Sequence, residues 1–388
     1  MRGVSKLWLR ISHVKVLITG ADGFIGKNLQ LHLAERKDVQ VLRFTRGDDV
    51  AHLPELLQDV DFVFHLAGIN RPQDPAEFVS GNVGLTHELC QAVAALAVAT
   101  GKKVPVVYTS STQANRDNAY GTSKLAAENA LFALQREYGV PVHVFRLPNV
   151  FGKWCKPNYN SAVATFCNNT VRGLPIQVND PAATVTLIYV DDVIERFLQL
   201  MDGADPAVDA AGFASVAPQY TTTVGELARL VQSFKDSRTT LMTERVGTGL
   251  VRALYSTYVS YLLPELFAYT VPQYADPRGV FAEMLKTPDC GQFSYFTAHP
   301  GITRGGHYHH SKTEKFLVIK GQARFKFKHM QTGQTHELLT SGDKAEVVET
   351  VPGWTHDITN VGADEMVVML WANEVFDREK PDTFACAL

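Results

Sequence analysis

A tyrosine and a lysine stand four residues apart, at Tyr120 and Lys124, where an alanine- and leucine-rich helical pattern begins that runs over 125–138. Residues i and i+4 share one face of a helix, so we expect the lysine ammonium near the phenol. A nearby cation favours phenolate, which predicts a lowered pKa for Tyr120 and a proton donor and acceptor near neutral pH. The pair alone is common by chance, so the surrounding elements decide its meaning.

Hydroxyl groups follow a predicted strand a short distance before this pair. Residues 104–109 form an apolar run typical of a buried strand, and Ser110, Ser111 and Thr112 follow at its carboxyl end. Ligands gather at the carboxyl ends of strands in open parallel sheets. A serine hydroxyl at that edge can bind the same substrate oxygen that Tyr120 protonates.

Three glycines at three-residue spacing, Gly20, Gly23 and Gly26, separate a strand-like run at 15–19 from a helical pattern at 27–36. The first lets the chain turn sharply, the second lets backbone approach a pyrophosphate, and the third lets the helix pack on the strand. The helix N-terminus adds N–H donors and a positive dipole. The same turn also fits an ordinary strand–helix connection, but with the hydroxyls and the Tyr/Lys pair downstream it predicts a dinucleotide site.

Further predicted strands at 39–44 and 61–68 complete an α/β, Rossmann-like, doubly wound parallel sheet. The first ends at Thr45 and Arg46, where an acidic residue would bind the ribose 2′-hydroxyl of NAD, whereas an arginine better fits the 2′-phosphate of NADP. We therefore expect NADPH as the cofactor, with a solvated surface arginine as the alternative for Arg46. His65 has apolar neighbours and is expected to be a core histidine with satisfied hydrogen bonds.

The last third of the chain has a different pattern. From residue 272 short alternating apolar runs are separated by Gly, Pro and Asp, which predicts an all-β sandwich or barrel. The spacing of His307, His309 and Glu314 between two glycines fits the first motif of the cupin family. A second motif at 352–360 supplies His356, although its proline–glycine spacing is one residue tighter than usual. Histidines at i and i+2 of a strand point to the same face.

Three histidines and one carboxylate suit zinc, iron or manganese, and we expect a metal site with zinc as the leading ion. Its ligands would be His307, His309, Glu314 and His356. The alternative is a cupin that holds no metal and uses a histidine of the first motif as a base. His310 and His329 are expected to be bystanders.

Composition excludes several classes of protein. The 388 residues suggest two domains, and 45% apolar with 20% charged residues is typical of a globular chain. A net charge of -3 argues against nucleic acid as a partner, and five scattered cysteines fit a reducing cytoplasm. We expect no membrane span, because no apolar run reaches the length of one. We interpret residues 1–13 as an extension, a cloning remnant or an early start.

Residues 14–245 resemble an extended short-chain dehydrogenase/reductase, the class that acts on nucleotide sugars. The matching segments are 19–26, 65–68, 110–112, 120–124, 146–152 and 189–193. The resemblance implies Tyr120 and Lys124 as the catalytic pair and Ser111 as the catalytic hydroxyl, with Thr112 as a second register. Only nine positions separate Ser111 from Tyr120, so the loop between them must be shorter than usual. The cofactor contacts implied are Gly20, Gly23, Phe24, Ile25, Gly26, Arg46, Leu66, Ala67, Gly68, Tyr120, Lys124, Pro148 and Asn149.

In this class the substrate lobe opens after residue 152. Here that stretch is rich in basic, aromatic and amide side chains. Lys153 or Lys156 could meet a pyrophosphate, Asn158 or Asn160 sugar hydroxyls, and Trp154 or Tyr159 a ring face, and the alternative is a structured surface loop. Asp191 and Asp192 are expected to anchor the lobe.

The whole chain resembles the bifunctional bacterial capsule and O-antigen enzymes of UDP-N-acetyl-L-fucosamine synthesis, most individually at 151–161, 254–258 and 305–310. The resemblance implies that a zinc-binding cupin domain inverts C3 of a UDP-2-acetamido-2,6-dideoxy-4-keto-hexose. An NADPH-dependent domain then reduces C4 to give UDP-2-acetamido-2,6-dideoxy-L-talose. It also implies a homodimer.

We expect four segments: the extension at 1–13, a reductase domain at 14–250, a linker at 251–271 and a cupin epimerase domain at 272–388. Two other functions stay open. In one, the chain is a single-step 4-ketoreductase or 4-epimerase whose cupin only binds sugar. In the other, it is a nucleotide-sensing or scaffold protein without turnover. If all four metal candidates hold a metal, the proton of the cupin step must be handled elsewhere, by Tyr308, His310 or Lys344.

Overall fold

The computed structural model describes residues 13–70, 72, 74, 76–267, 269–309, 312–330, 332–350 and 354–388. The chain forms two compact units, one of Met1–Ala228 with Ser256–Tyr261 and one of Arg229–Tyr255 with Leu262–Leu388. Each is described by itself below. The domain boundaries proposed at residues 250 and 271 stay predictions.

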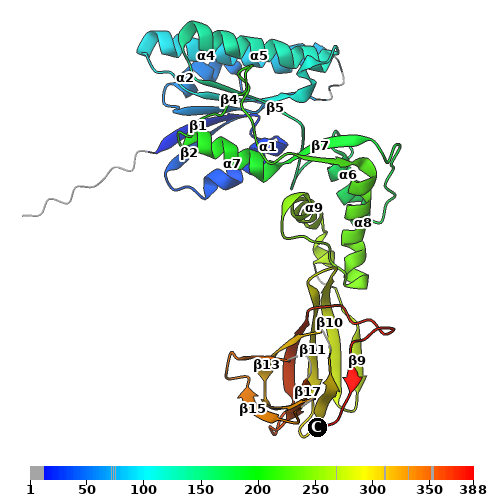
Figure 1. Ribbon diagram of the computed structural model, residues 1–388. Helices are drawn as coiled ribbons and strands as arrows, with labels where there is room; N and C mark the ends of the chain where they lie inside the picture. Colours follow the sequence, from blue (N-terminus) through cyan, green and yellow to red (C-terminus); the bar gives the residue numbers. More distant parts are fainter. Residues whose placement is uncertain are drawn as a thin grey trace, which may run out of the picture. The chain divides into compact units, whose positions relative to one another are not determined.

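The first unit is built on a five-stranded parallel sheet in the order β2-β1-β3-β4-β5. Its strands are β1 (Val14–Thr19), β2 (Val39–Phe44), β3 (Phe62–His65), β4 (Val106–Ser111) and β5 (Val142–Leu147). Helices α2 (Leu53–Leu57), α4 (Leu85–Thr100) and α5 (Ala119–Tyr138) cover one face, and α1 (Phe24–Ala34) and α7 (Val190–Met201) cover the other (Figure 1). This is the Rossmann-like, doubly wound sheet that the sequence predicts.

The strand order reverses between β1 and β3, and the crevice at such a point, outside the carboxyl ends of the strands, is where these sheets bind ligands. The strands are apolar on both faces because helices cover both. Leu17, Val63 and Val106, for example, are fully buried. The sheet therefore places the glycine turn after β1 and Ser111 at the end of β4 along one edge.

A smaller lobe follows, with the three-stranded sheet β6-β7-β8 made of β6 (Asn149–Phe151), β7 (Thr184–Tyr189) and β8 (Tyr220–Thr223). The remaining helical segments up to residue 266 are η1 (Val50–His52), α3 (Ala76–Phe78), η2 (Val79–Gly84), η3 (Thr112–Asn115), α6 (Ala162–Val171), α8 (Val224–Thr240), α9 (Gly249–Ser260) and η4 (Pro264–Leu266).

Several predicted elements begin or end at other residues in the structure, and two of these differences matter for the site. The helix expected at 125–138 begins at Ala119, so Tyr120 and Lys124 both lie on α5. The strand expected at 104–109 is β4, Val106–Ser111, so Ser111 is its last residue.

One helical stretch, Val79–Thr100, is long and apolar enough by length and composition to cross a membrane, so the expectation that no such stretch exists is wrong. Only 28% of its most apolar window is buried. However, core helices pass the same test, and Leu89 and Val93 on α4 belong to the core of the first unit. The observation is weak evidence for a membrane.

The second unit contains two antiparallel sheets, as expected for a cupin jelly roll. One has the order β16-β13-β18-β11-β10-β9 and the other β15-β14-β17-β12-β19. Their strands are β9 (Gln273–Asp276), β10 (Gly279–Thr287), β11 (Gly291–Ala298), β12 (Thr303–Tyr308), β13 (Glu314–Lys320), β14 (Gln322–His329), β15 (Thr335–Ser341), β16 (Val347–Glu349), β17 (Trp354–Asn360), β18 (Met366–Ala372) and β19 (Phe384–Ala385). Phe296, Phe316 and Phe325 lie in the core of this unit.

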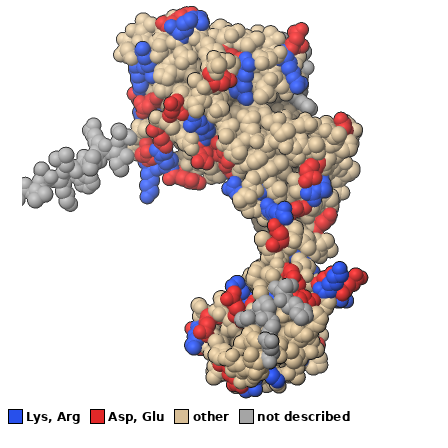
Figure 2. Space-filling model, viewed as in Figure 1, with Lys and Arg blue, Asp and Glu red and all other residues tan. Residues whose placement is uncertain are grey.

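Charged side chains of both signs are interspersed on the visible face of each unit (Figure 2). No large field of one sign covers that face, which agrees with the nearly balanced composition of 37 basic and 40 acidic residues.

Candidate functional site

The glycine turn after β1 brings backbone segments closer than any side chain would allow. Gly20 has a φ of 68°, and a Cβ there would lie 2.6 Å from backbone atoms of Ala67. A Cβ on Gly26 would lie 2.4 Å from the carbonyl oxygen of Gly20. Helix α1 starts at Phe24 without a side-chain cap. Its first N–H groups therefore remain available to a phosphate, as a dinucleotide site requires.

A cavity of about 1210 Å³ opens over this turn and over the carboxyl end of β4. It is lined by Gly20, Gly23, Phe24, Ile25, Gly26, Arg46, Leu66, Gly68, Tyr120, Lys124, Pro148 and Asn149 among the expected cofactor residues, by Ser111 and Thr112, and by Trp154, Lys156 and Asn160 among the expected substrate residues. Ala67, Lys153 and Asn158 are not among its lining residues. Gln113 and Arg116 also line it, and no pattern in the sequence predicts them there.

Arg46 is exposed on the wall of the cavity, where it could reach a 2′-phosphate. No role was predicted from the sequence for a second arginine near the same edge. Arg43 on β2 forms an ion pair with Asp22 in the glycine turn. Alternation along β2 was the available signal, because Arg43 interrupts an apolar run just before the strand ends.

Lys124 is buried, with 4% of its surface exposed. Its Nζ donates to the carbonyl of Thr109 at 3.0 Å and to the Tyr108 hydroxyl at 3.3 Å. Burial lowers the pKa of Lys124 to about 8, and the charge of Glu128 opposes that shift. Lys124 thus lines the cavity while its ammonium is tied to the end of β4.

Tyr120 does not have the lowered pKa that its spacing from Lys124 predicts. Burial raises the pKa of Tyr120, while a hydrogen bond with Ser111 acts in the opposite direction. The ring packs against Phe78 at 5.8 Å between centroids, which contributes to that burial. The sequence argument was wrong because it counted the cation and not the loss of water. The contact with Ser111 favours that residue over Thr112 as the partner hydroxyl.

The short loop between Ser111 and Tyr120 is tightly folded. The hydroxyl of Ser111 accepts from the N–H of Gln113 at the start of η3, and Asn118 caps α5 by accepting from the N–H of Gly121 at 2.8 Å. A Cβ on Gly121 would lie 2.3 Å from the carbonyl oxygen of Arg116. The loop can be this short because Gly121 lets it pack directly on the helix.

His65 is a core histidine, as predicted. Its Nδ1 lies 2.7 Å from the Thr19 hydroxyl and its Nε2 lies 2.8 Å from the Thr86 hydroxyl. Burial, with the charge of Lys124 adding to it, lowers the pKa of His65 to about 3. The ring is therefore neutral, with both nitrogens hydrogen-bonded.

Sequence reasoning missed a buried ion pair behind the catalytic candidates. Glu128 is 1% exposed and lies one helical turn after Lys124. It accepts from Arg146 at 2.9 and 2.6 Å and from the Ser110 hydroxyl. The i+4 spacing from Lys124 to Glu128 was the signal that could have found it.

Lys153 is engaged by protein rather than facing the cavity. Its Nζ lies 2.6 Å from Asp191, which also lies 3.1 Å from His32. Burial opposes ionisation of Asp191, but hydrogen bonds from Lys153 and Tyr189 lower its pKa below the usual value. This agrees with an anchoring role for Asp191. Asn158 adopts a φ of 53° in the same loop.

Lys156 and Trp154 lie on the cavity side of this loop. Trp154 has a φ of 68° and is 49% exposed. The Nζ of Lys156 lies 5.3 Å from the centre of the Tyr159 ring. An indole, a phenol and an ammonium at one cavity wall offer a stacking surface and a positive charge.

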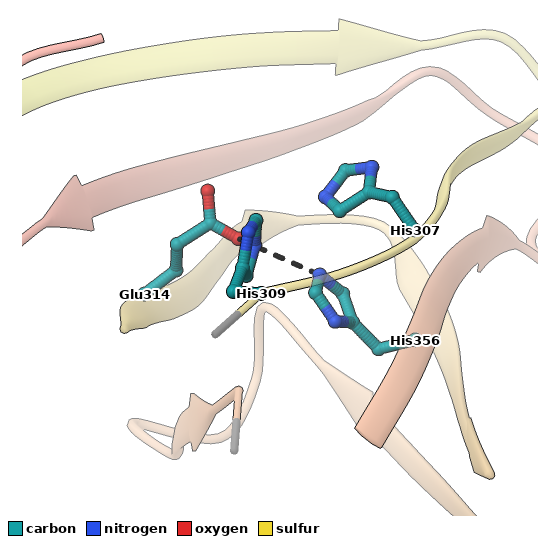
Figure 3. Close-up of side chains that lie close together, drawn as sticks. All are labelled: His307, His309, Glu314 and His356. Atoms are coloured by element: carbon teal, nitrogen blue, oxygen red, sulfur yellow. Dashed lines mark hydrogen bonds and ion pairs between the residues drawn. The ribbon is translucent and has the colours of Figure 1, made fainter. Parts of the chain in front are cut away.

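The second unit brings the four metal candidates together (Figure 3). His307 is the last residue but one of β12, and His309 follows that strand. Glu314 begins β13 and His356 lies on β17. One ligand atom from each lies within 4.8 Å of the others. Glu314 Oε2 is 3.1 Å from His309 Nε2 and 3.5 Å from His356 Nε2.

The donor atoms fit a metal ion. His307 Nε2 is buried without a hydrogen-bond partner among the described residues. Burial lowers the pKa of His307 to about 4, so its imidazole is neutral and offers a lone pair. Burial opposes ionisation of Glu314, but its contacts with His309 and His356 hold the pKa well below the usual range. Three imidazoles and one carboxylate are a donor set suited to zinc.

The other candidates for the cupin step are less well placed. The Tyr308 ring stacks on Phe384 at 5.4 Å, on the side of β12 opposite to His307. Lys344 is exposed in the turn after β15. His310 lies outside the described residues, as do Pro352 and Gly353 of the second cupin motif.

Comparison with known proteins matches both units. The model of the NAD dependent epimerase/dehydratase family matches residues 16–210, and that of the polysaccharide biosynthesis C-terminal domain matches residues 274–384. The chain is 61% identical over 375 residues to UDP-2-acetamido-2,6-beta-L-arabino-hexul-4-ose reductase of Pseudomonas aeruginosa, covering 97% of this chain and 99% of that protein.

Solved structures agree. The capsular polysaccharide assembling protein CapF of Staphylococcus aureus superposes with a TM-score of 0.87 at 42% identity, covering 96% of this chain and 100% of that one. UDP-glucuronic acid 4-epimerase of Bacillus cereus, with UDP-glucuronic acid and NAD, has a TM-score of 0.52 at 16% identity and covers 64% of this chain and 99% of that one. At that identity the second likeness concerns the fold alone.

Proposed function

Because the chain belongs to the family of the Pseudomonas reductase, and its first part to the NAD dependent epimerase/dehydratase family, we propose that it is a bifunctional nucleotide-sugar enzyme. The cupin unit inverts C3 of a UDP-2-acetamido-2,6-dideoxy-4-keto-hexose. The reductase unit then reduces C4 to give UDP-2-acetamido-2,6-dideoxy-L-talose, a precursor of UDP-N-acetyl-L-fucosamine for capsule or O-antigen.

A single observation carries the reductase step: Ser111, Tyr120 and Lys124 line the same cavity as the glycine turn. NADPH, when bound over that turn, supplies the hydride that C4 receives. Tyr120 gives its phenolic proton to the carbonyl oxygen, and Ser111 donates a hydrogen bond to the same oxygen. Lys124, held at the end of β4, provides positive charge in the same cavity as the proton leaves. The ketone thereby becomes an alcohol.

The order of the two steps follows from carbonyl chemistry. A ketone at C4 acidifies the hydrogen on C3, so a base can remove it and return a proton to the opposite face. Once C4 is an alcohol that acidity is gone. Epimerisation therefore comes first, and reduction locks in the new configuration.

For the cupin step we propose His307, His309, Glu314 and His356 as the ligands of one zinc ion. A zinc ion bound there supplies Lewis-acid stabilisation of negative charge on the C4 oxygen. This proposal is supported by their arrangement: His307, Glu314 and His356 lie on three strands, His309 follows one of them, and the ligand atoms lie within 4.8 Å of one another. In the competing cupin mechanism, which needs no metal, the base would be His307, whose buried Nε2 has no hydrogen-bond partner among the described residues.

The decisive experiment separates the two units. The protein is incubated with the UDP-4-keto sugar in D₂O without NADPH, and C3 is followed by NMR. We expect deuterium to enter C3 in the wild type and in Tyr120→Phe, and to stay out in His309→Ala. Lack of exchange beside normal NADPH-dependent reduction would instead leave a single-step reductase with a sugar-binding cupin. If the protein shows no exchange and no NADPH oxidation, the result would favour a protein without turnover.

A homodimer, a cytoplasmic location and the lack of nucleic-acid or membrane partners stay predictions. They come from the family resemblance and the composition. The proposed substrate contacts are Trp154, Lys156 and Asn160 on the cavity wall. Lys153 and Asn158, which were also predicted, fit better as residues that shape the loop.

A further inference from the structure

The end of the chain runs along the histidine cluster of the second unit. Residues 381–386, called the strap below, contain strand β19, which pairs with β12 so that Ala385 lies opposite His307 and Phe384 opposite Tyr308. The N–H of Cys386 donates to the carbonyl of Gly306 at 2.8 Å. The strap thus forms the edge of the sheet next to β12, the strand that carries His307 and leads into His309.

The strap touches His309 directly. His309 Nδ1 lies 2.6 Å from the backbone carbonyl oxygen of Asp382. A carbonyl oxygen can only accept, so Nδ1 carries a hydrogen, and in the neutral ring the lone pair is then on Nε2. Nε2 faces Glu314 at 3.1 Å, inside the cluster. One backbone carbonyl therefore sets both the tautomer and the direction of a proposed metal ligand.

Asp382 holds an unusual backbone shape to make this contact. Its φ is 36°, in a region that residues with a side chain seldom adopt. Its carboxylate Oδ2 accepts from the N–H of Lys312 at 2.7 Å. Strain that surrounding contacts hold in place is typical of positions where the exact direction of a group matters.

Lys312 holds the strap in place through hydrogen bonds. It is 5% exposed, and its Nζ donates to the carbonyl of Pro381 at 3.1 Å and to the Thr383 hydroxyl at 2.6 Å. The ammonium also lies 5.7 Å from the centre of the Phe376 ring. A buried ammonium needs such partners, so separating Lys312 from the strap would be costly.

The strap reaches the strand of His356 as well. The hydroxyl of Thr355, the neighbour of His356 on β17, donates to the carbonyl of Cys386 at 2.7 Å. Three of the four cluster residues are thus flanked by one six-residue segment.

We propose that the strap, locked by Lys312, is a positioning element of the cluster that orients His309 and so raises the affinity for zinc. This rests on the zinc site of the proposed function. Lys312 and Asp382 are positioning residues, because they act through His309 and need not touch the substrate. Outer partners of metal-bound histidines typically change metal affinity by about 10–100-fold.

The test compares zinc affinity, by competition with a chromogenic chelator, and the ¹⁵N NMR shifts of the His309 ring. Lys312→Met keeps the length and packing of the side chain but removes its donors, and Thr383→Val removes one partner in case the first variant fails to fold. Asp382→Ala loses the carboxylate, whereas Asp382→Asn keeps an oxygen acceptor and tolerates the positive φ. Lys315→Met, on an exposed side chain of β13, is the matched control.

We expect Lys312→Met and Asp382→Ala to bind zinc about 10–100-fold more weakly, Thr383→Val less so, and Asp382→Asn and the control like the wild type. Wild-type affinity in all variants would overturn the proposal and leave the zinc site standing. If the wild type binds no zinc, the proposed metal centre fails, and the NMR shifts decide. An Nδ1–H signal of His309 that Lys312→Met abolishes still supports positioning by the strap, and an unchanged signal overturns it.

Discussion

The Lys124 ammonium donates to the backbone carbonyl of Thr109 at 3.0 Å, two residues before Ser111. This bond ties helix α5 to the end of strand β4. Tyr120 is carried by the helix and Ser111 by the strand, so a single buried cation holds both proposed catalytic hydroxyls at one edge of the cavity.

Replacing Tyr120 by Phe should slow NADPH-dependent C4 reduction by about 10²–10⁴-fold, because the carbonyl oxygen loses its proton donor. Fold and cofactor affinity should change little, since the ring stays. The rate is read from NADPH oxidation. Tyr138→Phe, at the exposed end of the same helix, is the control. A Tyr120→Phe rate within twofold of the wild type would remove Tyr120 from the mechanism.

The pH dependence of stability should reveal the buried lysine. Burial lowers the pKa of Lys124 to about 8 from the ordinary 10.5. Between these values the unfolded chain binds more protons than the folded one, so this group adds stability as the pH rises. The free energy of unfolding of the wild type should therefore rise relative to that of Lys124→Met, by up to about 1 kcal/mol per pH unit from about pH 8 upward.

The measurement is urea unfolding of both proteins at about pH 7 and about pH 9.5. The difference between the two unfolding free energies removes the contributions of the buried tyrosines and cysteines, which both proteins share. A difference that stays constant with pH would mean that Lys124 keeps an ordinary pKa in the folded chain.

Arg46→Ala should raise the KM for NADPH by about tenfold and leave that for NADH nearly unchanged, because only NADPH carries the 2′-phosphate. Lys37→Ala, just before β2, serves as the control for a lost surface charge. Equal effects on both coenzymes, or none, would assign Arg46 to the solvated surface.

The two lysines of the substrate loop should behave differently. Lys156 lines the cavity, so Lys156→Met should raise the KM for the UDP-sugar about tenfold with little change in melting temperature. Lys153 pairs with Asp191, so Lys153→Met should lower stability by about 1–3 kcal/mol. Steady-state kinetics and thermal melts on the same samples check both. The reverse pattern would contradict the assignment of these side chains.

Removing metal should destabilise only a protein with an intact cluster. Glu314→Gln keeps the shape of the side chain but weakens the site, so its zinc content should fall well below that of the wild type. A strong chelator should lower the melting temperature of the wild type and leave Glu314→Gln unchanged. Glu337→Gln, exposed on β15, is the control. Equal metal content in all three proteins would place any bound zinc elsewhere.

Local patterns in the sequence predicted the parts of the site that depend on spacing. The glycine turn, the Tyr120/Lys124 pair and the order of the histidines are all short-range signals. Strand β2 was predicted to the residue, because alternation and flanking turns mark both of its ends.

Contacts between distant residues could not be predicted in this way. Asp382 orients His309 across 73 positions, and Asp191 takes Lys153 out of the substrate cavity across 38. Nothing near Lys153 in the sequence distinguishes it from Lys156. The raised pKa of Tyr120 was missed for a similar reason, since burial depends on the whole fold and not on the neighbouring lysine.

Asp191 links the segment expected to bind the coenzyme to the loop expected to bind the sugar. Its carboxylate contacts His32, on the helix that starts at the glycine turn. It also contacts Lys153, in the loop that carries Trp154 and Lys156. A ligand that stiffens either segment stiffens the other through the shared carboxylate. Such coupling is reciprocal, so we expect the proposed coenzyme and sugar to raise each other's affinity by the same factor, and Asp191→Asn to make their binding independent.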